Sequence, residues 1–193
     1  MSEPSYSLRA ATMDDVLKLP AIELAAGKLF PAERIPDPDA HLPIAELERA
    51  CRSGGLFVAV LAASAPVGDG ADPIHGAAPV DAGPDQPVGF AVCEESAVTL
   101  HLLELSVHPD HGRRGLGRRL VTRVVEEAAA RGLEAVTLTT FADIPWNAPF
   151  YAAMGFEVLS EQDLTAFLAG ALEEERALGL TERVARVILR GGP

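Results

Sequence analysis

Runs of apolar residues divide the chain into short strands separated by helices. Segments that alternate between apolar and polar residues, or that are rich in β-branched residues, are predicted strands. They lie at 7–12, 56–61, 88–93, 97–107, 135–141, 156–159 and 183–189. Turns are predicted at 94–96 and 109–112, on either side of the longest strand.

Helices are predicted where apolar residues recur every three or four positions. The longest covers 116–131, where an apolar stripe repeats every four residues from Leu116 to Ala128. Another follows the first strand, with Asp14 or Asp15 as its expected N-cap. Three shorter helices are predicted at 44–52, 146–154 and 164–180.

One long segment, 62–87, fits neither pattern. It holds five prolines and four glycines and almost no large apolar residue. This composition predicts a flexible insertion between two strands, and a lid over a substrate is the alternative. The remaining pattern is continuous, so residues 1–193 are expected to form a single domain.

Charge and composition exclude several classes of function. The chain carries 28 acidic and 16 basic residues, a net charge of −12, which disfavours nucleic acid and anionic membranes as partners. No apolar run reaches the roughly 20 residues that cross a bilayer, and the first ten residues lack the apolar core of a signal peptide. Cys51 and Cys93 are expected to be free thiols, and no ligand cluster predicts a metal site. A cytoplasmic protein is therefore expected.

The basic residues are unevenly distributed. Five of the 14 arginines fall between Arg113 and Arg123, beside glycines at 112, 115 and 117. This segment joins a predicted strand to the helix 116–131, so its backbone N–H groups and the helix N-terminus are suited to binding phosphate. No Walker Gly-Lys-Ser/Thr is present, and a dinucleotide fingerprint would need its third glycine at Leu120. The alternative is an ordinary glycine-rich turn before a solvated helix.

The sequence ELSVHPDHGRRGLGRRLV resembles the acetyl-CoA motif of the GNAT superfamily of N-acetyltransferases, (Q/R)xxGx(G/A) after a strand ending in V-x-P. Gly115 and Gly117 match its glycines, whereas Gly112 stands where the family has Gln or Arg. A second stretch, NAPFYAAMGF, resembles the family's N-x-x-x-Y-x-x-x-G-F, with Asn147 and Tyr151 four residues apart on one helix face. Taken alone, Asn147 also suits a helix N-cap, and Tyr151 a half-buried packing role.

The resemblance implies a fold, a cofactor and a set of contacts. The fold is of the α/β (α+β) class: a central mixed, mostly antiparallel sheet of six or seven strands with helices on both faces. The activity is transfer of an acetyl group from acetyl-CoA directly to a primary amine. The implied cofactor-binding residues are Leu105, Ser106, Val107, Gly112, Arg113, Arg114, Gly115, Leu116, Gly117, Arg118, Asn147, Phe150 and Tyr151.

By the same resemblance, Asn147 binds the pantetheine arm and the Tyr151 hydroxyl points at the sulfur as general acid. Leu105 and Val107 present backbone N–H groups where the family's strand splays at a bulge. The only other tyrosine, Tyr6, is expected at a frayed end and is set aside. Superfamily bases often lie on the strand 97–107, which contains a histidine and a glutamate.

The base is a choice between His101 and Glu104. In a regular strand His101 shares a face with Leu105, and Glu104 lies on the other face; a bulge would exchange them. His101 is preferred, and an ordinary structural histidine is its alternative. His108 and His111, in the loop, are lesser candidates.

Other functions remain open at this point. A non-catalytic acyl-CoA-binding or sensor module would keep the loop without needing an acid or base, and another type of nucleotide-binding domain is a third possibility. For the enzyme, the expected partner is a small-molecule amine such as an aminoglycoside or polyamine, which an acidic surface would attract. An exposed edge strand makes a homodimer conceivable.

Overall fold

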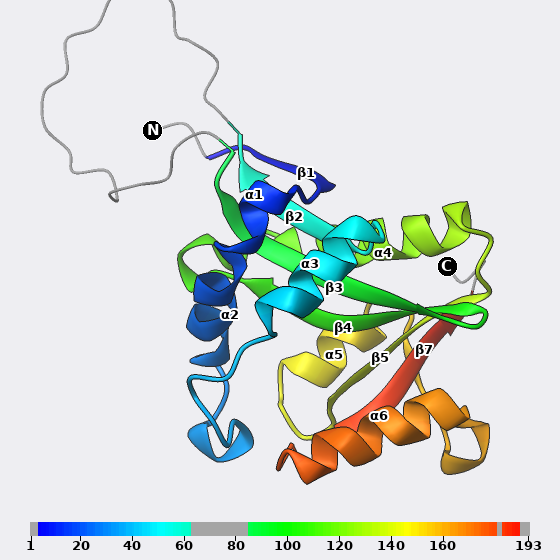
Figure 1. Cartoon of the computed structure of the whole chain (residues 1–193). Coiled ribbons are helices and arrows are strands. Elements are labelled where there is room, and N and C mark those ends of the chain that lie inside the picture. Colours follow the sequence, from blue (N-terminus) through cyan, green and yellow to red (C-terminus); the bar gives the residue numbers. More distant parts are fainter. Residues whose placement is uncertain (1–3, 63–84, 181–182, 190–193) are drawn as a thin grey trace, which may run out of the picture.

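The computed structural model describes residues 4–62, 85–180 and, as backbone, 183–189 (Figure 1). Its strands are β1 (Tyr6–Ala10), β2 (Leu56–Leu61), β3 (Pro87–Ser96), β4 (Thr99–Val107), β5 (Ala135–Phe141), β6 (Glu157–Val158) and β7 (Arg183–Leu189). Its helices are α1 (Met13–Val16), α2 (Leu19–Gly27), α3 (Ile44–Arg52), α4 (Leu116–Ala130), α5 (Asn147–Ala152) and α6 (Ala166–Ala177). Short 3₁₀ turns lie at Ala32–Arg34, Pro109–His111 and Glu161–Asp163.

The strands form one sheet in the order β1-β2-β3-β4-β5-β7-β6. Every neighbouring pair is antiparallel except β4 and β5, which are parallel and are joined through α4. The mixed, mostly antiparallel sheet of six or seven strands is therefore confirmed. The parallel pair requires a long crossover, and the amphipathic helix α4 provides it.

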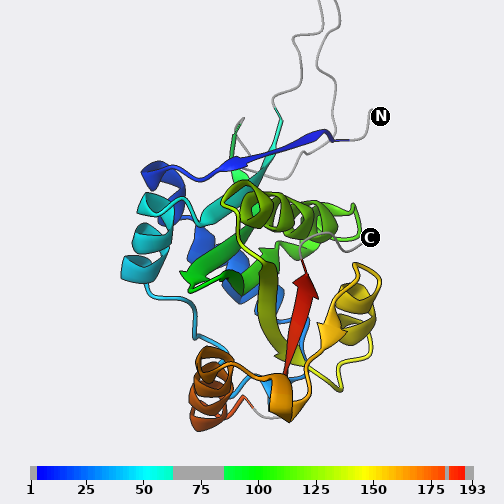
Figure 2. The same cartoon turned by 90° about the vertical axis from the view of Figure 1, so that its right-hand side faces the viewer.

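Helices cover both faces of the sheet, as predicted (Figure 2). The apolar stripe of α4, together with Tyr151 of α5, packs on one face over Ala91, Leu100 and Leu138. On the other face α1, α2 and α3 bury an apolar cluster that includes Phe90. The helix α6 lies on that second face, where it packs on β5 and β7. The face of α4 and α5 is called here the first face, and the opposite one the second face.

The sheet opens in its middle, between β4 and β5. These strands pair only from Thr99–Ala135 to Leu102–Leu138, and within the described residues no strand pairs with that edge of β4 beyond Leu102. On its other edge β4 stays paired with β3, but the register skips Leu103. The skip is a β-bulge, which bends β4 away from β5. Beyond Leu102 a gap therefore separates β4 from β5, and the edge of β4 that faces the gap is free of strand pairing within the described residues.

Two local predictions are wrong. The first helix is preceded by Thr12, whose N–H and hydroxyl both donate to the Asp15 carboxylate (2.8 and 2.9 Å), so neither Asp14 nor Asp15 is the N-cap. The turn predicted at 94–96 lies at Ala97, which has a φ of +48°, because β3 continues pairing with β4 through Ser96. The core of the predicted insertion at 62–87 lies outside the described residues.

Candidate functional site

The phosphate loop lies where β4 passes through a 3₁₀ turn into α4. Two residues give it its shape: Gly115, the N-cap of α4, has a φ of +75°, and Arg113 has a φ of +58°. These left-handed residues turn the chain so that the first N–H groups of a 15-residue helix end the loop. The side chains of Arg113, Arg114 and Arg118 are exposed around it. The strand, the turn and the helix thus follow one another as the sequence predicts, and binding of an anion at this loop stays a prediction.

The unusual glycine of this loop has a local reason. A Cβ on Gly112 would lie 3.1 Å from the Pro109 carbonyl oxygen, which is tighter than ordinary packing. The 3₁₀ turn Pro109–His111 therefore presses on this position and favours glycine. A Cβ on Gly117 would stand only 3.6 Å from the Phe150 ring, so the start of α4 lies against α5 and the two motifs meet.

Tyr6 is part of this region, and its expected place at a frayed end is wrong. It lies in β1, paired with Leu61. Its hydroxyl accepts a hydrogen bond from the Arg114 guanidinium and lies 3.0 Å from His111 Nδ1. Burial, followed by the charges of Arg114 and His108, lowers the pKa of His111. The strand β1 thus supports the phosphate loop, and no local pattern in the sequence indicates such a long-range contact.

The free edge of β4 points its backbone donors into the gap. The His108 N–H donates to the Val88 carbonyl at 2.8 Å, which fixes the direction of the alternating N–H groups along β4. The N–H groups of Leu105 and Val107 therefore face away from β3, toward the gap. Ser106 has the opposite orientation, and its hydroxyl donates to Glu104 Oε1 (2.7 Å) on the second face.

The second motif stands across the gap on α5. Asn147 is 6% exposed, and its Oδ1 accepts a hydrogen bond from the Thr140 hydroxyl at 2.8 Å. Trp146 is the N-cap of this helix, so the N-cap alternative for Asn147 is wrong. Tyr151 is 8% exposed and lies edge-on to Phe150, with ring centroids 4.9 Å apart.

The first face therefore gathers several of the predicted cofactor residues, although the Ser106 side chain lies on the second face. Tyr151 belongs to the apolar cluster against which Leu105 and Val107 pack. Leu116, the first residue of α4, is buried in the same cluster. The start of α4, the residues Leu105 and Val107 of the free β4 edge, and Tyr151 of α5 thus border the same apolar cluster on the first face.

On the second face, the bulge brings the two candidate bases to the same side of β4. Because Leu103 is skipped, His101 and Glu104 share this face, and Leu105 lies on the first face. The expectation that His101 shares a face with Leu105 is wrong for this reason. His101 is 2% exposed, its Nδ1 is 2.9 Å from Thr137 Oγ1, and its ring meets Phe167 of α6 edge-on at 5.1 Å.

Glu104 has a neighbour that the sequence interpretation missed. Glu23, on α2, accepts the Leu42 N–H with both carboxylate oxygens (3.0 and 3.1 Å). Burial, together with the charge of Glu104, raises the pKa of Glu23 to about 8, while the Leu42 N–H acts in the opposite direction. The available signal was one acidic residue inside the otherwise apolar helix 19–27.

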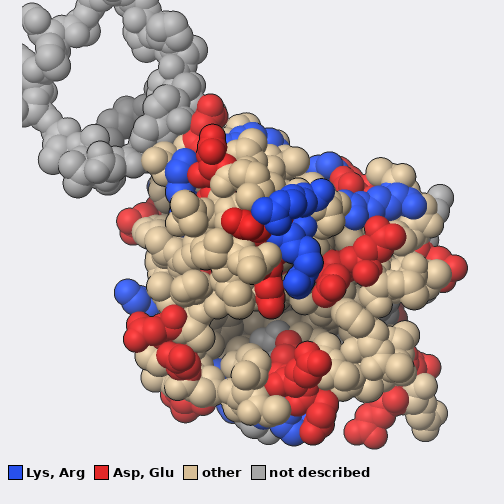
Figure 3. Space-filling model, viewed as in Figure 1, with Lys and Arg blue, Asp and Glu red and all other residues tan. Residues whose placement is uncertain are grey.

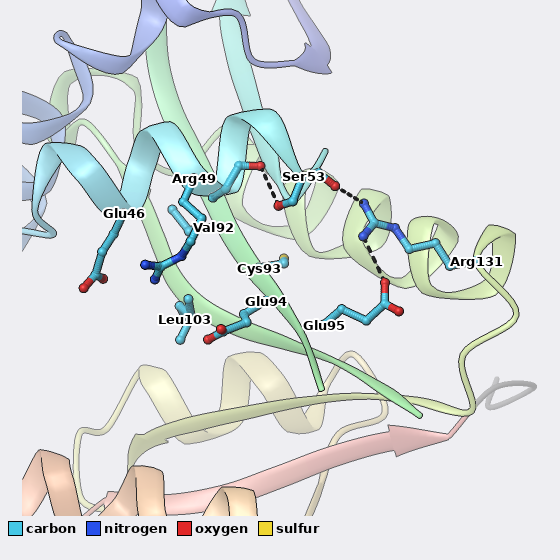
Figure 4. Close-up of a pocket in the computed structure, with 10 residues that line it drawn as sticks. Glu46, Arg49, Ser53, Val92, Cys93, Glu94, Glu95, Leu103 and Arg131 are labelled. Atoms are coloured by element: carbon cyan, nitrogen blue, oxygen red, sulfur yellow. Dashed lines mark hydrogen bonds and ion pairs between the residues drawn. The ribbon is translucent and has the colours of Figure 1, made fainter. Parts of the chain in front are cut away.

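A cavity of about 260 Å³ lies beside this pair, between α3 and the strands β3 and β4 (Figure 4). Its lining consists of Glu46, Arg49, Ala50, Ser53, Val92, Cys93, Glu94, Glu95, Leu103 and Arg131. Arg131 is held by Glu95 (3.3 Å) and by Glu127 (3.0 Å). Within the described residues Arg49 has no ion-pair partner. The bulge residue Leu103 connects this cavity to the region of Glu104.

The cysteines lie as expected. Cys51 and Cys93 are both free thiols, and burial raises the pKa of the Cys93 thiol well above its ordinary value. In the part of the chain described, no three His, Cys, Asp or Glu side chains gather as metal ligands would. No helix there is long and apolar enough to cross a membrane.

Comparison with known proteins shows the family to which the chain belongs. Residues 40–156, more than half of the chain, match the model of the acetyltransferase (GNAT) family. A stretch of 79 residues is 32% identical to an uncharacterized N-acetyltransferase of Methanocaldococcus jannaschii and covers 37% of this chain and 35% of that relative.

Solved structures share the fold at low sequence identity. The PaiA N-acetyltransferase from Thermoplasma acidophilum, in complex with coenzyme A, is 14% identical with a TM-score of 0.62, over 96% of this chain and 99% of that one. The N-acetylglutamate synthase from Neisseria gonorrhoeae, complexed with coenzyme A and N-acetyl-glutamate, is 16% identical with a TM-score of 0.65, over 97% of this chain but 36% of the synthase. The chain, which spans about a third of the length of these two relatives from Methanocaldococcus jannaschii and Neisseria gonorrhoeae, belongs to the acetyltransferase (GNAT) family.

Proposed function

We propose that this chain transfers an acetyl group from acetyl-CoA directly to a primary amine of a small molecule, with Tyr151 as general acid and Glu104 as general base. The observation that carries the proposal is the free edge of β4, which leads into the glycine- and arginine-rich loop before α4 and packs on the same apolar cluster as the buried Tyr151. A strand edge with a basic loop at one end and a phenol nearby suits a ligand that has phosphates at one end and a reactive group at the other.

The residues of the first face fit coenzyme A. The left-handed turn at Arg113 and Gly115 and the N-terminus of α4 suit its pyrophosphate. The N–H groups of Leu105 and Val107 suit the amide and carbonyl oxygens of an extended arm, and the Asn147 amide suits the same arm. When bound, acetyl-CoA supplies an activated acyl group as a thioester.

Tyr151 is proposed as the acid because of its position. It lies edge-on to Phe150 and belongs to the apolar cluster of the first face, against which Leu105 and Val107 of the free β4 edge pack. A thiol has a pKa near 8.5, so a hydrogen bond from the phenol assists departure of the thiolate at neutral pH. Tyr6 is engaged by His111 and Arg114 at the loop instead.

Glu104 is proposed as the base in preference to His101. The attacking amine must be neutral, so a group must accept its proton, directly or through water. His101 is enclosed by Thr137 and Phe167, whereas Glu104 is half-buried at the bulge where β4 leaves β5. Its carboxylate is oriented by the Ser106 hydroxyl, and Glu23 lies on the helix packed beside it.

The wider setting follows from charge and thiol chemistry. The net charge of −12 supports a cationic amine and disfavours nucleic acid. Two free cysteines support a reducing, cytoplasmic location. A homodimer stays a prediction.

The experiment is a panel of amines incubated with acetyl-CoA, in which release of free thiol is followed. Thiol release that depends on both protein and amine supports transfer. If coenzyme A binds, as measured by calorimetry, while no amine in the panel is acetylated, the non-catalytic sensor is favoured. Binding of ATP or NAD in preference to coenzyme A would contradict both.

A further inference from the structure

The second face holds a group of aromatic and acidic residues that the cofactor does not require. The gap between β4 and β5 is bridged on this face by α2 and the turn that follows it, which end at Phe30 (Figure 1). Glu23 lies on α2, where the charge of Glu104 on β4 acts on it, and Phe30 lies in the turn after α2, where its ring contacts Phe141 of β5. The segment therefore presents an acid near β4 and an aromatic ring near β5.

Phe30 joins an aromatic cluster at the end of β5. Its ring centroid lies 5.7 Å from that of Phe141 and 4.8 Å from that of Trp146. Phe141 and Thr137 are four residues apart in β5, so their side chains share a face of the strand. Thr137 contacts His101 on the second face, so Phe141 lies on that face too. An ion pair between Arg34 and Asp143 ties the same two loops together.

The cluster is partly open to solvent. Trp146 is 50% exposed, whereas Phe141, which contacts the same Phe30 ring, is 2% exposed. Space-filling shows this face hollowed between the part formed by α2 and α3 and the part formed by α6, with acidic side chains along the lower rim (Figure 3). An exposed tryptophan held against another aromatic ring is a surface suited to a ligand.

The charges around it complement a cation. Phe141 and Glu104 lie beyond the last β4–β5 pair on the two arms of the gap and on the same face, and Glu23 lies on α2, which packs on β4. Burial, followed by the charge of Glu104, raises the pKa of Glu23, so the ionised form of Glu23 is disfavoured without a cation nearby, and a bound cation would favour it. Aromatic rings add an attraction for ammonium groups.

Building on the proposed function, we propose that the acceptor binds against Phe30 and Trp146 beside Glu23 and Glu104, and that it is an alkyl amine with a second ammonium group. The reacting amine gives its proton to Glu104, so that one positive charge is lost there. The second ammonium is held by the aromatic faces and by Glu23, which releases its proton to solvent as the cation binds. The alkyl chain between them packs on Trp146.

The chain contains a built-in probe for this site. Trp146 is its single tryptophan, so intrinsic tryptophan fluorescence reports on this residue alone. We expect diaminobutane to change the emission in a saturable way, and butanediol, which has the same length but no charge, to leave it unchanged. Butylamine, with one ammonium, is expected to bind about 10-fold more weakly than diaminobutane, as loss of one charged contact would give.

Variants separate this site from the neighbouring cavity. Phe30→Leu and Glu23→Gln are expected to raise the dissociation constant for diaminobutane about 10-fold, while the dissociation constant for coenzyme A stays within about twofold. Arg49→Ala is the matched control, since Arg49 lines the adjacent cavity and lies outside the proposed site. Thermal unfolding of each variant establishes that it is folded.

The outcomes distinguish this inference from the proposed function. If Arg49→Ala weakens diamine binding and Phe30→Leu does not, the acceptor lies in the α3 cavity and the inference is wrong. If diaminobutane is acetylated but does not alter Trp146 emission, the inference also fails while the proposed function stands. If coenzyme A binds but no amine is acetylated, the proposed function itself fails.

Discussion

Arg113 combines backbone strain with a charge that a ligand would use, and replacing it should change stability and affinity in opposite directions. Its φ of +58° lies in the left-handed region, and within the described residues its side chain makes no hydrogen bond or ion pair. For a residue with a Cβ, this conformation costs about 1–2 kcal/mol. Glycine avoids that cost but loses about 0.5–1 kcal/mol in backbone entropy. Arg113→Gly should therefore stabilise the fold by about 0.5–1 kcal/mol.

The same substitution removes a cation from the phosphate loop. Because Arg113 is exposed and adjacent to the N-terminus of α4, its charge is available to a phosphate. Its loss should weaken coenzyme A binding about 5- to 10-fold at low salt, and less at high salt. Arg113→Ala is the control, because it removes the same charge and keeps the strained conformation.

Thermal unfolding and calorimetry test both halves. For a chain of this size, the expected gain for Arg113→Gly corresponds to a rise of about 1–4 °C in Tm, and Arg113→Ala should show no rise. Both variants should lose the same affinity for coenzyme A. If Arg113→Gly is no more stable than Arg113→Ala, the strain argument is refuted. If neither variant loses affinity, Arg113 does not contact the phosphates.

Three further predictions concern buried or bridging groups. Asn147→Ala should lower stability by about 1–3 kcal/mol in chemical unfolding, because the Thr140 hydroxyl loses its acceptor, and should also weaken coenzyme A binding in calorimetry. Tyr6→Phe should cost about 1 kcal/mol by the same assay and leave turnover unchanged; a large loss of turnover would contradict the assignment of Tyr151 as the acid. Glu23 keeps its proton up to about pH 8 in the folded protein, whereas the unfolded chain releases it near pH 4.5. Stability should therefore fall as the pH rises from about 4.5 to 8, and Glu23→Gln should flatten that fall in a series of thermal unfolding curves.

Much of the fold follows from patterns that are local in sequence. Four elements have the bounds that the sequence predicts, to the residue: the strands 56–61, 135–141 and 183–189 and the helix 44–52. Each has a clear apolar pattern and is bounded by residues such as Gly54 and Pro43. The phosphate loop was also predictable, since its glycines, arginines and flanking elements are contiguous. These features depend on neighbours within about one helix or strand.

The missing parts depend on contacts between distant segments. The bulge at Leu103 is set by how β3 and β4 pair, and nothing in the strand itself marks it. The bulge places His101 and Leu105 on opposite faces of the sheet, so the prediction from strand alternation that they share a face is wrong. Glu23 gains its role only because α2 crosses β4, and Tyr6 gains its role only because β1 reaches the phosphate loop.

The central claim is that this chain catalyses acetyl transfer with Tyr151 as its acid, and one comparison tests it most directly. Turnover of acetyl-CoA with an accepted amine is measured for the unaltered protein and for Tyr151→Phe, together with the dissociation constant for coenzyme A. The account predicts that Tyr151→Phe loses about 10-fold or more in turnover, while its affinity for coenzyme A changes less than about twofold. Turnover equal to that of the unaltered protein would contradict the account.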